Sequence, residues 1–230
     1  MSTKKYRMVV ILGLMVICYM VAKTTPDDAN IMCVYCGAGF NGNVVDYAKT
    51  IAIYLCYSVA IYDVFYEYIH GYGIYQMIRE TKRLVVLRQC YKKLLADIAI
   101  IEMIKLLGFT LFLLLLKRNI VFTDIKPLVF YFLGVLGFLM LQMVLEILTT
   151  SNLALLISNV VFVVNVSLGD AVNRHLGKHW LNGLVSTSGM LQYRNEELVQ
   201  FDYVFAGLYM SVVIILIVAS IISVKNKDFI

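Results

Sequence analysis

Charged residues and prolines are scarce in this sequence. Asp, Glu, Lys and Arg make up 15% of its 230 residues, only two residues are proline, and 61% of the chain is hydrophobic. A soluble domain is usually about half apolar and about a quarter charged. Several long stretches contain almost no charge, and they approach the ~20 residues that a helix needs to cross a bilayer. The composition therefore argues against an ordinary soluble domain and predicts a membrane protein.

Motifs of catalysis and nucleotide binding are also missing. The sequence has no phosphate-binding loop of the GxxxxGKS/T type, no HExxH and no GxSxG. We therefore expect this chain to be no enzyme, with no catalytic residue, no metal site and no cofactor. Any use of ATP would need a separate protein that binds the nucleotide.

Six apolar segments remain between the charged, glycine-containing and amide-rich stretches. They cover about residues 6–22, 47–66, 98–116, 127–148, 153–168 and 203–224. We expect each to be a helix, because lipid offers no hydrogen-bond partner to an open backbone. A cleaved leader is the competing interpretation of the first segment, but Met20 does not fit the small-residue pattern of a cleavage site. The predicted fold class is all-α, with residues 1–230 forming a single transmembrane domain of six helices.

The distribution of Lys and Arg predicts the side that each loop faces. With a cytoplasmic N-terminus, eleven of these residues fall on the inner side and eight on the outer side, while Lys105 lies within the third segment. Positively charged loops tend to stay in the cytoplasm. We therefore expect both termini inside, and we interpret the net charge of +5 as a topology signal and not as a nucleic-acid interface.

A basic segment of about residues 67–93 separates the second and third apolar segments. Its apolar residues recur at helical spacing, and basic residues share another face. The apolar residues are Leu84, Leu87, Tyr91, Leu94 and Leu95, and the basic ones are Arg79, Lys82 and Arg83. Such a helix can lie at the membrane surface, where it either presents its charged face to a partner or anchors the chain to anionic lipid. The spacing leaves both open.

The outer loops contain two features of interest. Cys33 and Cys36 form a CxxC in the first one, which can close a disulfide or exchange one. A relaying second pair is missing, so we favour a structural or incidental pair over a thiol oxidoreductase. The last outer loop, residues 169–202, has the glycines and polar residues of short interfacial helices.

Ionisable and polar residues within the apolar segments are expensive in lipid and mark candidate functional positions. Glu102 and Lys105 are three residues apart and can pair along one helix. These side chains are expected to face the bundle interior, where they either bond neighbouring helices or line a path for a substrate. The candidates for the path are Tyr54, Tyr57, Tyr62, Asp63, Glu102, Lys105, Glu146, Asn159 and Asn165.

In layout, the chain resembles the membrane subunit of type-2 ABC exporters, particularly small Gram-positive permeases of peptide or bacteriocin export and self-immunity. The similar features are the six spans, the amphipathic segment after span two and the polar outer region before span six. The run Ile78-Arg79-Glu80-Thr81-Lys82-Arg83, followed by Tyr91-Lys92-Lys93-Leu94-Leu95, looks like the coupling helix of that family.

The resemblance implies a multi-pass permease of a bacterial cytoplasmic membrane that moves a hydrophobic or amphipathic substrate such as a peptide. It further implies a second, identical or homologous permease subunit and two copies of an ATPase subunit that holds ATP and magnesium. The ATPase would dock on Arg79, Glu80, Lys82, Arg83 and Arg88. A thiol oxidoreductase that uses Cys33 and Cys36, and a scaffold or immunity protein without transport, are the alternatives.

Overall fold

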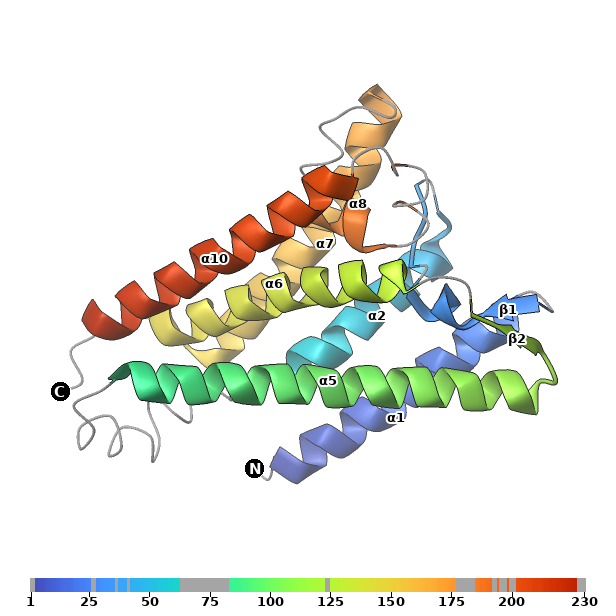
Figure 1. Ribbon diagram of the computed structural model, residues 1–230, viewed down its shortest axis with the longest axis horizontal. Coiled ribbons are helices and arrows are strands. Elements are labelled where there is room, and N and C mark those ends of the chain that lie inside the picture. Colours follow the sequence, from blue (N-terminus) through green and yellow to red (C-terminus); the bar gives the residue numbers. More distant parts are fainter. Residues whose placement is uncertain are drawn as a thin grey trace.

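The computed structural model describes residues 3–25, 28–35, 37–40, 42–62, 83–122, 125–176, 185–191, 194, 198 and 202–226, and these are mostly helical (Figure 1). The helices are α1 (Thr3–Thr24), α2 (Val44–Ala60), α5 (Arg83–Leu115), α6 (Lys126–Leu148), α7 (Ser151–Leu176), α8 (Ser186–Met190) and α10 (Asp202–Asn226). Two short strands, β1 (Asp28–Asn30) and β2 (Asn119–Val121), and a 3-10 helix, η1 (Ile31–Tyr35), complete the described elements.

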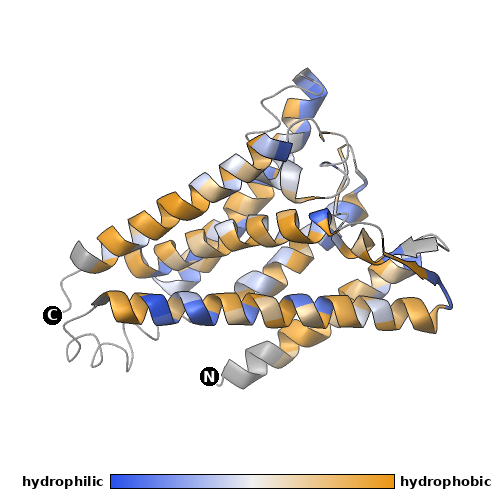
Figure 2. Cartoon of the chain, in the orientation of Figure 1, coloured by the Kyte–Doolittle hydropathy of each residue, from blue (hydrophilic) through white to orange (hydrophobic). Residues whose placement is uncertain are grey.

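Four helices are long and apolar enough to cross a membrane: the greater parts of α5 and α7, all of α6, and α10 up to Val224. The apolar part of α1, Met8–Thr24, is shorter. Long stretches of these helices consist of apolar residues, as the colouring in Figure 2 shows. This composition is compatible with a multi-pass membrane protein. The count of six spans stays a prediction, because the second predicted span continues to residue 66, beyond the described part of α2.

Helix α5 joins two segments that the sequence analysis separates. Residues 67–82 lie outside the described part of the chain, but Arg83–Leu115 is one uninterrupted helix of 33 residues. The predicted break between a surface helix and a third span is therefore wrong from residue 83 onward. The physical reason is that this stretch has no proline, and Lys92, Lys93 and Asp97 are compatible with a helix. At about 1.5 Å per residue the helix is about 50 Å long, which exceeds the ~30 Å of hydrocarbon.

The buried face of α5 also differs from the predicted one. Leu87 and Leu94 are buried as expected, whereas Leu84 and Leu95 are exposed. Val86 and Cys90 take their place in the core, because they continue the i, i+4 row that leads through Leu94. The row continues into the apolar half of the helix without a change of face.

Part of the predicted outer loop, residues 169–202, is helical. Helix α7 extends to Leu176, eight residues past the predicted end of the fifth segment, because Asp170 and Arg174 are tolerated in its last turns. The predicted outer loop 169–202 therefore begins within a helix, and it also contains the short helix α8. Strands β1 and β2 pair in parallel and correct the all-α prediction. Each strand follows the C-terminal end of a helix, and those helices, α1 and α5, pack side by side.

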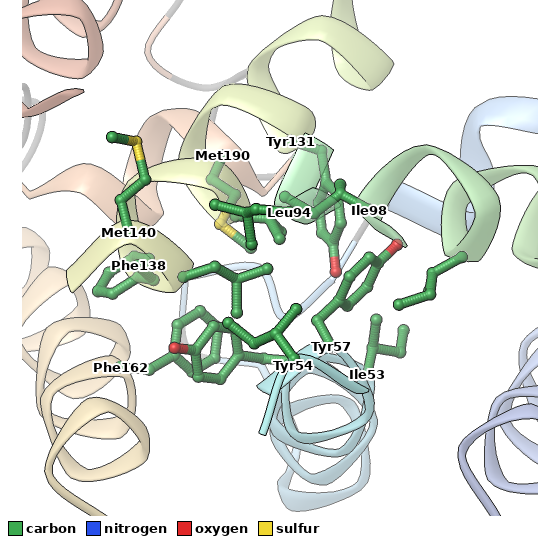
Figure 3. Close-up of a cluster of buried hydrophobic side chains, with 14 of the residues drawn as sticks. Ile53, Tyr54, Tyr57, Leu94, Ile98, Tyr131, Phe138, Met140, Phe162 and Met190 are labelled. Atoms are coloured by element: carbon green, nitrogen blue, oxygen red, sulfur yellow. The ribbon is translucent and has the colours of Figure 1, made fainter. Parts of the chain in front are cut away.

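Helix α6 lies at the centre of the bundle and packs against α7, α8 and α10. Figure 3 shows the aromatic and aliphatic side chains around it, which come from α2, α5, α7 and α8 as well. Gly134 permits the close approach of α8, because a Cβ at this position would lie 2.8 Å from Met190.

Candidate functional site

A buried ion pair of Glu102 and Lys105 lies on α5. Lys105 Nζ lies 3.0 Å from Glu102 Oε2, so the pairing expected from the three-residue spacing is present. Lys105 is completely buried and Glu102 is 5% exposed. Among the described residues the ammonium has no partner with hydrogen-bond geometry, so its stabilisation is mainly electrostatic. A buried cation of this kind is costly unless other groups compensate it.

Three tyrosine rings supply that compensation. Lys105 Nζ lies 3.9 Å from the ring centre of Tyr131 on α6, 4.1 Å from that of Tyr35 in η1 and 5.3 Å from that of Tyr57 on α2. The negative face of an aromatic ring attracts a cation at this range. We call Glu102, Lys105 and these three residues the tyrosine cage. Figure 3 shows Tyr57 and Tyr131 together within the core.

Each oxygen of the Glu102 carboxylate accepts a hydrogen bond from a tyrosine hydroxyl group. Tyr35 donates to Glu102 Oε2 at 2.9 Å, and Tyr57 donates to Oε1 at 2.7 Å. Burial raises the pKa of the Tyr35 hydroxyl, and the negative charge of Glu102 raises it further. The Tyr35 hydroxyl therefore keeps its proton and remains a donor. The cage joins α2, α5, α6 and η1 through one charged centre.

A second polar cluster joins α2, α6 and α7. Ser58 donates to Gln142 Oε1 at 2.6 Å, and Gln142 Nε2 donates to the Ser58 carbonyl at 3.1 Å and to Glu146 at 3.4 Å. Asn159 donates to Ser58 Oγ at 3.0 Å and Ser158 donates to Gln142 at 3.3 Å. Glu146 and Asn159 therefore take part in one interhelical network, which we call the glutamine cluster. It satisfies polar groups that would otherwise be expensive in an apolar bundle.

The remaining path candidates lie in different surroundings. Tyr54 is buried in the aromatic core, where its ring stacks on Phe162 with the ring centres 4.0 Å apart (Figure 3). Tyr62 donates a hydrogen bond to Asn152 of α7, and Asp63 lies outside the described residues. Asn165 accepts hydrogen bonds from the backbone N–H and the hydroxyl of Thr187 in α8. The structure thus distributes these candidates over several sites. Five of them are buried in the interior of this chain, namely Tyr54, Tyr57, Glu102, Lys105 and Glu146.

A buried arginine, Arg194, has no counterpart in the sequence predictions. Its guanidinium donates to Asp170 Oδ1 at 2.9 Å, to the Val166 carbonyl at 2.9 Å and to the Ala38 carbonyl at 3.0 Å. The side chain is completely buried. The sequence counts it as an outer-loop charge, because Asp170 is 24 residues away and no local spacing connects the two. The hydrogen bonds of Arg194 thus reach both α7 and the loop before α2.

The predicted ATPase-docking residues are only partly described. Arg88 is exposed on α5, and Arg83 is the first residue of that helix. Arg79, Glu80 and Lys82 lie outside the described residues, as does Cys36. The disulfide between Cys33 and Cys36 therefore stays a prediction. Cys33 itself lines a pocket beside Lys49.

One family of proteins matches the sequence over nearly its whole length. The family is described as a protein of unknown function (DUF2705), and the match covers residues 12–230. No curated protein and no solved structure matches the chain. Since the family description gives no activity, the chemistry of the helices and of their buried polar groups is the guide to function.

Proposed function

We propose that this chain, which belongs to the DUF2705 family, is the permease subunit of an ATP-driven exporter in a bacterial cytoplasmic membrane. It moves a hydrophobic or amphipathic substrate such as a peptide, with two copies of a separate ATPase and a second permease subunit as partners. The six spans, the inward termini and the absence of ATP and magnesium from this chain belong to the same proposal.

The observation that carries the proposal is the continuity of α5. One helix contains Arg88, exposed near the proposed docking segment, and the Glu102–Lys105 pair in the core. The 14 residues from Arg88 to Glu102 span about 21 Å of helix. No proline interrupts this length, so a displacement of the docking end is transmitted to the tyrosine cage.

A displacement of α5 would have to break contacts within the buried clusters. Tyr57 and Tyr131 contact the α5 charges from α2 and α6, and Ser58 and Gln142 hold α2 against α6. We interpret this arrangement as the closed conformation of the transporter. ATP binding to the partner would tilt α5 and separate these contacts, so that polar groups now paired with each other face a path between the two permease subunits.

Co-purification of the chain with an ATPase subunit from its native cells tests the docking surface. Reversal of Arg79, Arg83 and Arg88 to Glu is expected to abolish the complex, because the surface then repels its partner. The matched control reverses Lys23, Lys117 and Arg174, three basic residues at or just after the C-terminal ends of α1, α5 and α7, to Glu and is expected to leave the complex intact. An ATPase complex that survives the first reversal would contradict this docking surface.

Substrate flux distinguishes transport from the alternatives. Vesicles that contain the permease and the ATPase should move peptide only with ATP, and Cys33→Ser should have little effect. Peptide binding without flux would favour an immunity or scaffold protein. Loss of activity in Cys33→Ser would favour thiol chemistry.

A further inference from the structure

A pocket lies where α1 ends and α2 begins, apart from the tyrosine cage and the glutamine cluster. Its cavity volume is about 80 Å³. A single water needs about 10–15 Å³ by this measure, so the pocket has room for a small molecule and not for a folded partner. Its wall contains one basic and one acidic side chain, Lys49 and Asp46, on the first turns of α2.

Among the described residues, Lys49 has few hydrogen-bond partners. Its ammonium carries three donors, and in the described part of the chain it contacts Asp46 Oδ1 at 3.4 Å and Thr24 Oγ1 at 3.3 Å. Both distances exceed the usual range for an N–H donor, so neither bond is strong. The side chain is only 14% exposed. A partly buried ammonium with weak partners favours an anionic ligand.

Asp46 offers the opposite charge beside it. Its side chain is 36% exposed, and only one of its two carboxylate oxygens has a partner among the described residues. The other oxygen is available to an ammonium group. Val21, Val34 and Ile53 line the same pocket and supply an apolar wall.

We propose that this pocket binds a small aliphatic α-amino acid as its zwitterion. The carboxylate of the ligand contacts Lys49, the ammonium of the ligand contacts Asp46, and the aliphatic side chain lies against Val21, Val34 and Ile53. A peptide end carries only one of the two charges at a given terminus, so it fits the paired wall less well. The inference does not depend on the proposed transport function.

Three probes that differ in charge test the proposal on the purified full chain in detergent. Equilibrium dialysis would measure binding of valine, N-acetylvaline and valinamide, which present both charges, the carboxylate alone and the ammonium alone. The wild type is expected to bind valine saturably and about tenfold or more tighter than either analogue, because each loses one charge-assisted contact. No saturable valine binding, or equal affinity for the three probes, would overturn the proposal, and this arm needs no variant to fold.

Two variants assign the charges. Lys49→Gln should weaken valine binding by about tenfold or more and abolish its advantage over valinamide. Asp46→Asn should instead abolish the advantage over N-acetylvaline. Lys117→Gln, the same substitution at an exposed position outside the pocket, is the control and should bind valine as the wild type does. Wild-type selectivity in both pocket variants, with their melting temperatures unchanged, would also overturn the assignment.

Discussion

The tyrosine cage and the Arg194 site compensate a fully buried cation in different ways. Lys105 relies on one carboxylate and the faces of three rings, whereas Arg194 relies on directed hydrogen bonds to Asp170 and to two backbone carbonyls. The difference follows from chemistry, since an ammonium is a compact point charge and a guanidinium is a planar fork of five donors. We therefore expect the stability of the cage to depend on charge compensation, and that of the Arg194 site to depend on the planar geometry of the side chain.

Removal of the Glu102 carboxylate should cause the largest loss of stability among the variants at these two sites. Glu102→Ala leaves Lys105 without its counter-ion and leaves the Tyr35 and Tyr57 hydroxyls without an acceptor. We expect the free energy of unfolding to fall by about 3–5 kcal/mol, the usual consequence of breaking a buried ion pair. Chemical unfolding in mixed micelles, followed by circular dichroism, measures the change.

A double variant separates charge from packing at the same position. Glu102→Gln with Lys105→Met removes both charges but keeps an acceptor for the tyrosines, so it should unfold closer to the wild type than Glu102→Ala does. If the double variant were the less stable of the two, charge compensation would not be the main role of Glu102.

The shape dependence of the Arg194 site predicts the next largest effect. Arg194→Lys keeps the charge but cannot reach Asp170, Val166 and Ala38 together, and should cost about 2–3 kcal/mol of unfolding free energy. Lys126→Ala is the control, since the ion pair of Lys126 with Asp202 is partly exposed and should contribute less than about 1 kcal/mol. If the two variants lost the same unfolding free energy, the directed hydrogen bonds of the Arg194 guanidinium would not contribute more than an exposed ion pair.

The smallest effect concerns the proton of Tyr35. Its pKa is raised in the folded state, so the stability that the proton contributes is complete below about pH 10, the ordinary tyrosine pKa, and falls as the pH rises above it. The stability difference between the wild type and Tyr35→Phe should therefore fall by up to about 1.4 kcal/mol per pH unit above pH 10. Thermal unfolding between pH 8 and about pH 11 measures this difference, and a constant difference would argue against the buried hydroxyl.

The sequence predicts the helices better than their ends. Long apolar runs identify α5, α6, α7 and α10, because hydropathy depends on composition alone. Helix α5 begins well before the third predicted span, because no helix-breaking residue separates its basic and apolar parts. Helix α7 continues past the predicted end of the fifth segment, because polar residues such as Asp170 are compatible with its last turns. Strands of three residues, like β1 and β2, are too short for an alternating pattern.

The candidate site was predictable only where its partners are close in sequence. Glu102 and Lys105 lie on one face of one helix, so their pairing follows from spacing. Tyr35 and Tyr131 come from elements far along the chain, and nothing local connects them to Lys105. The same holds for Arg194 and Asp170. Contacts between buried charges that lie far apart in the sequence can be identified only once the fold is known.

The pairing of β1 with β2 has a consequence for engineering the chain. Parallel backbone hydrogen bonds join residues 28–30 to 119–121 whatever side chains these residues carry, and so they fasten the end of α1 to the end of α5. Substitutions there should be tolerated, whereas insertion of one residue between Thr25 and Asp28 would shift the register of the small sheet. The two helices thus run in the same direction as one unit, and main-chain hydrogen bonds join their C-terminal ends.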